Sequence, residues 1–325
     1  MTLTTNALIE RAPALTGGAV DALAHDFRLR ACCPIDEGDG PAFWNDALVS
    51  PLRTAMPGLE DRCDIAMSGH FEGGHWLARS GHLAGLFAEP LFGIPASRRV
   101  AFLRYGRFDR FEGARVVETL LLLDLPALMI EAGVWPLGAP LGPPRMAPGP
   151  ATRDGVAPAS LPDRDGAQSV GLVEAMIAGL GKFDGGSLRK MGMTDFWTDD
   201  FWWYGPAPIG NFRGHADYER GHQAPFLAAF PDRKGGHHRA RFGERHYACS
   251  TGWPSIYATH KGGDWLGLAA TSKPVTMRVM DFWRRDAASD LLIENWVMID
   301  IADFCRQLGC DVFARMAALT PDQRS

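Results

Sequence analysis

The chain has 325 residues, with 46% apolar side chains and a net charge of −5 from 33 basic and 38 acidic groups. This length allows about two domains, and the composition excludes a disordered chain or collagen. No basic excess is present to neutralise a phosphate backbone, so the charge balance argues against nucleic acid as the main partner. A small molecule or a protein is the expected partner.

The N-terminal region and the cysteines indicate in which cellular compartment the protein is expected. The first ten residues hold no basic segment followed by an apolar stretch, and the most apolar region, 116–135, is broken by acidic residues and Pro126. We therefore expect no signal peptide, no bilayer span and a cytoplasmic protein. The six cysteines include no C-x-x-C pair, so we expect reduced, mostly buried thiols.

Helical material precedes strands in each half of the sequence. Alternating apolar patterns predict strands at 75–82, 101–108, 116–123, 255–260, 275–283 and 291–299, and apolar spacing predicts helices from Ser169 and over 217–230. Short glycine-containing connections favour antiparallel pairing of successive strands. The sequence thus predicts an α+β fold with helices on one side of a curved antiparallel sheet.

An internal repeat indicates two copies of one domain. Pro51, Ala55 and Pro57 recur as Pro225, Ala229 and Pro231, all at the same offset along the chain. Further on a short insertion lengthens the offset slightly, which matches Glu118 with Glu294 and Asp124 with Asp300. A period this long indicates duplicated domains. We predict a first domain at 1–137, a Pro/Gly-rich linker at 138–168 and a second domain at 169–325.

Several short motifs resemble a known family. Gly93–Val100, Arg110–Gly113 and Val116–Glu118 with Asp124 beyond, and in the second copy Gly267–Thr271, Asp281–Arg284 and Glu294–Val297 with Asp300, resemble the C-terminal half of SnoaL-like polyketide cyclases. That family belongs to the nuclear transport factor 2-like (NTF2-like) superfamily. The resemblance implies two tandem cone-shaped α+β barrels, each with an apolar pocket at its open end.

The resemblance also implies a chemistry. Characterised family members close a polyketide ring by an intramolecular aldol step, without metal or cofactor, using a pocket carboxylate and a nearby histidine. Here the carboxylate position falls on Leu121 and Val297, and the histidine position on Arg107 and Asp281. The aldol chemistry therefore does not transfer residue for residue.

Polar residues on the last strands of the second copy are the first candidates for a site. Asn295, Val297 and Ile299 share one face of a strand, and the resemblance turns that face into the cone, with Asp281 beside Asn295. An aspartate in an apolar, tryptophan-lined pocket has a raised pKa suited to acid/base work. The alternative is that Asp281 pairs with Arg278 or Arg284.

Histidines and aromatic residues complete the candidate set. His222, on the predicted helix, and His260, at a strand end, are candidate proton relays, and Tyr204 is a candidate to polarise a carbonyl, with structural roles as the alternatives. Trp203, Trp283, Val297 and Asp300 are the candidate substrate contacts, although an aspartate before a helix, such as Asp300, also suits an N-cap. Seven of the ten tryptophans follow residue 190 and either line a pocket or fill a core.

The basic run 233–241 is predicted as a solvated loop, with an anion site as the alternative. The histidine spacings do not suit a metal site, so we expect no metal, and the resemblance to SnoaL-like cyclases implies that no cofactor is used.

The sequence therefore predicts a cofactor-independent enzyme acting by proton transfer, through cyclisation, isomerisation or hydrolysis, on a small apolar cyclic or polyketide-like compound. The alternative is a non-catalytic binding or assembly protein on the same scaffold. The second copy is the expected working half and the first a scaffold. We expect the two cones to form a pseudo-dimer within the chain, and a homodimer is left open.

Overall fold

The chain folds into two compact units, seen in a computed structural model that describes residues 3–17, 20–156, 165–183, 191–263 and 265–319. The first unit comprises Met1–Pro136, Pro148–Ser160 and Asp300–Ser325, and the second comprises Leu137–Ala147 and Leu161–Ile299. The units therefore divide the chain at other places than the predicted domains, since parts of the predicted linker join each unit and the C-terminal segment joins the first. None of the helices described is long and apolar enough to cross a membrane.

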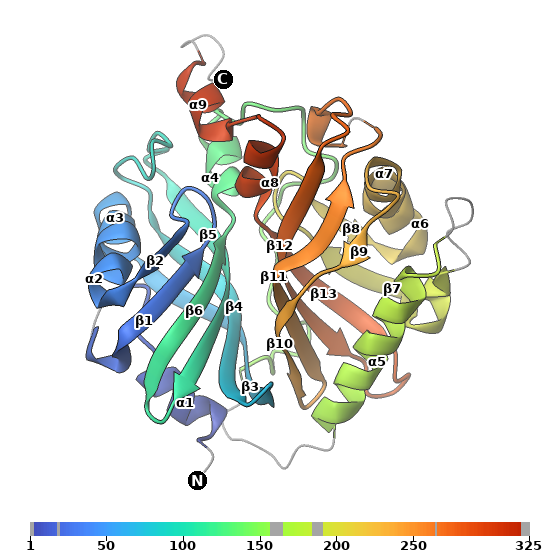
Figure 1. Ribbon diagram of the computed structural model, residues 1–325, viewed down its shortest axis with the longest axis horizontal. Coiled ribbons are helices and arrows are strands. Elements are labelled where there is room, and N and C mark those ends of the chain that lie inside the picture. Colours follow the sequence, from blue (N-terminus) through green and yellow to red (C-terminus); the bar gives the residue numbers. More distant parts are fainter. Residues whose placement is uncertain (1–2, 18–19, 157–164, 184–190, 264, 320–325) are drawn as a thin grey trace. The chain divides into compact units, whose positions relative to one another are not determined.

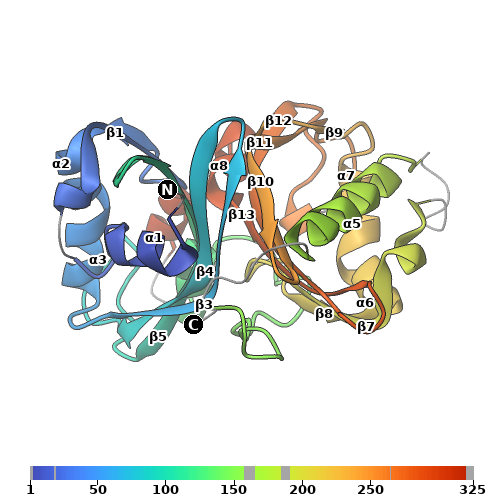
Figure 2. The ribbon, with the colours of Figure 1, turned by 90° about the horizontal axis from the view of Figure 1, so that it is seen from below.

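The first unit is built on a six-stranded sheet with the order β2-β1-β6-β5-β4-β3. Its strands are β1 (Leu23–Ala31), β2 (Glu37–Asp39), β3 (Glu60–Phe71), β4 (Gly74–Leu86), β5 (Val100–Glu112) and β6 (Arg115–Leu123). Its helices are α1 (Thr5–Arg11), α2 (Gly40–Trp44), α3 (Ser50–Ala55), α4 (Leu125–Glu131), α8 (Ile301–Gln307) and α9 (Val312–Ala317). Helices α1, α2 and α3 lie on one face of the sheet (Figure 2).

The second unit repeats this plan. Its strands are β7 (Trp197–Tyr204), β8 (Asn211–Arg213), β9 (Lys234–Gly235), β10 (His238–Glu244), β11 (Tyr247–Thr259), β12 (Pro274–Arg285) and β13 (Leu292–Ile299). The sheet order is β10-β11-β12-β13-β7-β8, with β9 paired to β11. Helices α5 (Asp165–Leu180), α6 (Gly214–Tyr218) and α7 (Ala224–Ala229) lie against the sheet (Figure 1).

Element boundaries recur at the spacing of the sequence repeat. In each unit a helix of five residues, a π-helical turn of five and a helix of six follow one another, beginning at Gly40 in the first unit and at Gly214 in the second. The distance along the chain from the start of β5 to the start of β12 equals the distance from Pro51 to Pro225. The starts of α4 and α8 are likewise separated by the same number of residues as Asp124 and Asp300. The expected tandem α+β architecture is therefore confirmed.

One expectation about strand direction was wrong. Successive strands from β3 to β6 are antiparallel, as are those from β10 to β13, but β1 pairs in parallel with β6 and β7 pairs in parallel with β13. Each sheet is therefore mixed. The parallel pairs join the first long strand of a unit to its last, and nearly the whole unit supplies the crossover that parallel pairing requires.

Candidate functional site

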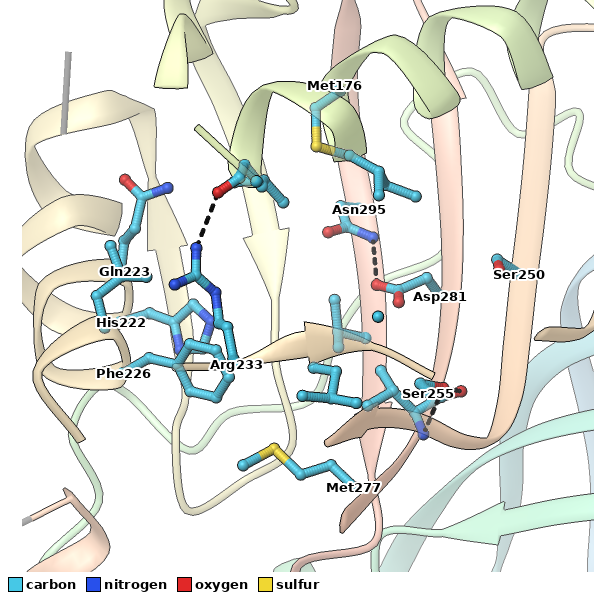
Figure 3. A pocket seen from close by; sticks show the side chains of 18 of the residues that line it. Met176, His222, Gln223, Phe226, Arg233, Ser250, Ser255, Met277, Asp281 and Asn295 are labelled. Carbon is cyan, nitrogen blue, oxygen red and sulfur yellow. Dashed lines mark hydrogen bonds between the residues drawn. The ribbon is translucent and has the colours of Figure 1, made fainter. Parts of the chain in front are cut away.

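A cavity of about 320 Å³ lies in the second unit, between the sheet and the helices that cover it. Figure 3 shows Asp281 and Asn295 on the sheet side and His222, Gln223 and Phe226 on the helical side. Its walls are mostly apolar, with a few polar groups, which is the usual make-up of a small-molecule site.

Two rows of side chains form the sheet wall. One row runs across Ser250, Asp281 and Val297 on β11, β12 and β13, and the next runs across Trp283, Asn295 and Trp203 on β12, β13 and β7. Because alternate residues of a strand share a face, the cavity side also takes Ile299. The predicted face of β13 and the predicted contacts Trp203, Trp283 and Val297 all lie on this wall.

Asp281 is the acidic side chain of the cavity. Asn295 Nδ2 donates to Asp281 Oδ1 at 3.4 Å and to the Phe282 carbonyl at 3.1 Å. The Phe282 carbonyl can only accept, so it sets the orientation of the amide and keeps its N–H groups toward the aspartate. Burial raises the pKa of Asp281 to about 7, against opposing effects of the Asn295 hydrogen bond and the Arg241 charge. A carboxylate with this pKa exchanges protons readily near neutral pH.

The predicted alternative, an ion pair between Asp281 and an arginine, is not found among the described residues. Arg284 pairs with Glu294 on the opposite face of the same two strands, and the Arg278 guanidinium lies 4.6 Å from the Trp253 ring centre. Asp281 is therefore held by an amide and left with a raised pKa.

A second polar group adjoins the first. Arg241 Nη2 lies 2.6 Å from His238 Nε2, and Ser250 Oγ lies 3.1 Å from His238 Nδ1. Because an arginine can only donate, the nearer ring nitrogen, Nε2, accepts from Arg241, whose Nη2 also lies 3.2 Å from Nδ1. Burial and the Arg241 charge lower the pKa of His238 to about 4. Glu174 Oε1, which lies 3.3 Å from Arg241 Nη1, partly opposes that shift. His238 is thus a neutral hydrogen-bonding group of the cavity wall.

The helical wall carries His222 and Gln223, which lie in the π-helical turn Glu219–Gln223. The His222 ring stacks on Trp203 at 4.2 Å, and burial lowers its pKa to about 3. His222 Nδ1 and both amide atoms of Gln223 have no hydrogen-bond partner within the described part of the chain. Wide π turns often mark functional sites, and these unpaired polar atoms are available to a ligand.

Sequence reasoning missed Tyr218 and Trp197, which also line the cavity. Tyr218 lies beside Trp203 and His222, and burial together with the negative charge of Asp281 raises the pKa of the phenol. The buried indole N–H groups of Trp197 and Trp283 have no acceptor among the residues described. Tyr218 could have been found only from its place four residues before His222 on the predicted helix.

Three of the predicted site residues lie outside the cavity lining. Tyr204 follows Trp203 on β7, so it points to the opposite face, where its ring stacks on Trp296 at 5.6 Å. His260 lies just beyond β11, and its ring packs 5.5 Å from Phe230. Burial lowers the pKa of His260.

Asp300 is the third of these residues and belongs to the first unit. Its carboxylate accepts from the backbone N–H of Asp303 at the start of α8 and from that of Cys33, each at 3.1 Å. The helix-capping interpretation is therefore the correct one for Asp300.

The first unit has a different arrangement at the equivalent positions. Arg107, which corresponds to Asp281 in the repeat, donates to Asp109 Oδ1 at 2.8 Å and to the Pro13 carbonyl at 2.7 Å. Arg79 and Thr119 donate to the same aspartate at 3.1 and 2.6 Å. Arg79 and Arg107 thus pair their charges with that of Asp109, and the bond from Arg107 to the Pro13 carbonyl connects the N-terminal segment to the sheet. In the described residues of both units, no cluster of three or more His, Cys, Asp or Glu is placed to hold a metal.

Comparison with solved structures finds several that are similar to part of this chain. A candidate SnoaL-like polyketide cyclase from Jannaschia sp. CCS1 is 18% identical, with a TM-score of 0.34 over 40% of this chain and 94% of its own. TsrD from Streptomyces laurentii is 18% identical, with a TM-score of 0.35 over 46% of this chain and 98% of its own. An NTF2-like protein from Burkholderia xenovorans LB400 is 15% identical, with a TM-score of 0.32 over 44% of this chain and 97% of its own.

The sequence matches no protein-family model and no curated protein. The three solved structures each match a little under half of this chain.

Proposed function

We propose that the second unit is a cofactor-independent enzyme that moves a proton on a small apolar compound, cyclic or polyketide-like, with Asp281 as the acid/base. One observation carries the proposal. Asp281 lies on the wall of an apolar cavity with its pKa raised to about 7. Its carboxylate accepts a hydrogen bond from the neutral Asn295 amide, where an ion pair would have lowered the pKa. Perturbed carboxylates in such cavities are typical of proton-transfer sites.

The first step would be removal of a proton from a carbon next to a carbonyl. The Asp281 carboxylate takes that proton and becomes a neutral acid, and the electron pair of the C–H bond moves to the carbonyl oxygen as an enolate. Tyr218 stays protonated at neutral pH because its pKa is raised, and Trp283 offers an N–H without a partner in the described structure. Either group can donate to the enolate oxygen, which stabilises the charge where it develops.

The second step returns the proton. Where a C=C bond of the compound is conjugated with the enolate, delivery of the proton from Asp281 to the far carbon of that dienolate moves the double bond and gives an isomer. If the enolate carbon instead attacks a second carbonyl of the same molecule, a C–C bond closes a ring and Asp281 protonates the new alkoxide. Both outcomes regenerate the Asp281 carboxylate, so neither consumes a co-reactant. His222, with a pKa of about 3, is neutral throughout and serves as a hydrogen-bonding group rather than as an acid.

The test is hydrogen–deuterium exchange of an apolar bicyclic ketone, 2-tetralone, followed by NMR in deuterated buffer. We expect the protein to accelerate exchange next to the carbonyl, and Asp281→Asn to lower that acceleration by about 100-fold or more. Asp199→Asn, which removes an exposed carboxylate of β7, is the matched control and should exchange at the wild-type rate. Equal rates for Asp281→Asn and the wild type would refute the role of Asp281. Binding of the ketone without accelerated exchange would favour a non-catalytic ligand-binding protein.

A further inference from the structure

Arg233 is a half-buried cation on the wall of the same cavity. Its Nη2 donates to the carbonyl of Leu180, the last residue of α5, at 3.0 Å, and its guanidinium lies 5.7 Å from the centre of the Phe183 ring. The dashed line at Arg233 in Figure 3 marks the bond to that carbonyl. These two contacts hold the side chain in place and leave most of its N–H donors without a partner among the residues described.

The charge of Arg233 has no carboxylate partner in the described part of the chain. Three other arginines of the second unit that are shielded from solvent do have one: Arg241 pairs with Glu174, Arg284 with Glu294 and Arg285 with Asp290. A cation withdrawn from water without a counter-charge is costly, and burial accordingly lowers the pKa of Arg233. An anion supplied from the cavity would remove that cost.

Tyr218 connects this cation with the acid/base group. Its phenol lies within electrostatic reach of both charges, since Asp281 raises the pKa of Tyr218 and Arg233 lowers it. All three side chains line one cavity, whose apolar wall includes Phe226 and Met277. A ligand that spans the cavity can therefore place an anionic group at Arg233 and an apolar ring near Asp281.

We propose that Arg233 makes the site selective for apolar ring compounds that carry a carboxylate. The planar guanidinium binds a carboxylate through two parallel N–H donors, and a single charge of each sign neutralises the pair. This proposal rests on the proposed function, because it names the substrate class of the same site. It assigns the arginine at the start of the basic run 233–241 to the anion site that the sequence left as an alternative.

The experiment compares two ligands of matched shape, 2-naphthylacetic acid and 2-naphthylacetamide, by isothermal titration calorimetry at neutral pH. We expect the wild type to bind the acid about 10-fold or more tightly than the amide. Arg233→Met, which keeps the length of the side chain, should abolish that preference, and Arg233→Lys should retain part of it. Arg220→Met is the matched control: it removes an exposed arginine that does not line the cavity, and its preference should equal that of the wild type.

Each outcome of this titration decides the proposal. Equal affinities of the wild type for the two ligands would overturn it, and so would an unchanged preference in Arg233→Met. If Arg233→Met does not fold, Arg233→Gln takes its place: loss of the preference in Arg233→Gln with partial preference in Arg233→Lys supports the proposal, and an unchanged preference in Arg233→Gln overturns it. The titration does not depend on turnover, so Asp281→Asn must still prefer the acid. Failure of proton exchange with retained acid preference would refute the proposed function alone.

Discussion

Replacing Asp281 with Asn should stabilise the protein at alkaline pH, although it removes the proposed acid/base group. Burial raises the pKa of this carboxyl from 3.8 to about 7, a difference of roughly three units at about 1.36 kcal/mol each. The full cost of ionising Asp281 in the folded protein is therefore about 4 kcal/mol, reached above pH 7. Since the side chain is partly open to the cavity, screening lowers the expected gain to about 2–3 kcal/mol. Asn can still accept the Asn295 hydrogen bond through its own Oδ1.

The direction of the pH dependence follows from which state holds the proton. Between about pH 4 and pH 7 the unfolded chain has released the Asp281 proton while the folded protein keeps it. The contribution of Asp281 to the free energy of unfolding is therefore complete below pH 4, falls as the pH rises through this window, and is flat above it. The Asn variant lacks this fall, so the difference between the two proteins should grow from near zero at pH 4 to its maximum near pH 8.

Urea unfolding followed by tryptophan fluorescence measures this difference. Seven of the ten tryptophans follow residue 190, so the signal reports mainly on the second unit. Asp199→Asn, with the exposed carboxylate, provides the reference for losing a negative charge without relieving burial. Parallel stability curves for Asp281→Asn and the wild type from pH 5 to pH 8 would refute the account, because they would mean that Asp281 ionises as easily in the folded protein as in the unfolded chain.

Three further predictions concern buried polar groups. The His222 ring, whose pKa is lowered to about 3, should stay neutral from pH 5 to pH 8 in ¹⁵N-detected NMR, and titration near pH 6 would contradict its burial. Gln223→Leu should hold or raise stability by up to about 1–2 kcal/mol, since both buried amide atoms lack partners among the described residues, while weakening 2-tetralone binding in calorimetry; a large loss of stability would mean that the amide has a structural role. Arg107→Met should destabilise the protein by about 3–5 kcal/mol in urea, because it leaves the buried Asp109 carboxylate with fewer partners, and a loss below about 1 kcal/mol would count against this.

The repeat was the most informative feature of the sequence for the fold. Matches such as Pro51 with Pro225 lie in helices α3 and α7, which occupy equivalent places in the two units, so the identity of single residues reported the placement of whole elements. Strand positions followed from alternation, which burial of one face imposes. The parallel pairing of β1 with β6 was not predicted, because the connection between these strands spans most of the unit and leaves no local pattern.

Strand alternation also explains which site residues were predicted correctly. Asn295 and Val297 reach the cavity because they alternate on β13. Trp203 and Tyr204 were both predicted to contact the ligand, whereas neighbouring residues of a strand point to opposite faces of the sheet. Recognising 197–204 as a strand would have kept only one of the pair.

The helical wall could not be derived in the same way. Tyr218 and Arg233 come from segments whose direction depends on how the helices lie on the sheet, and that packing is a tertiary property. Their polar atoms have no sequence pattern in common with Asp281. Tyr218 lies within electrostatic reach of both Asp281 and Arg233, and this relation arises only when the cavity is assembled.

Equivalent positions on β5 of the first unit and β12 of the second hold residues of opposite charge, Arg107 and Asp281. In the first unit Arg107 donates hydrogen bonds to Asp109 and to the Pro13 carbonyl, so its charge is paired within the unit. In the second unit Asp281 stands at that position, and Trp283 stands where Asp109 stands in the first, so the carboxylate faces the cavity and forms no ion pair with the residues described. A chain with two such units can stabilise one unit through buried ion pairs while the other keeps a buried carboxyl without an ion-pair partner. Burial that raises the pKa of that carboxyl to near 7 suits it to proton transfer, and the same burial lowers the stability of the folded protein when the carboxyl ionises.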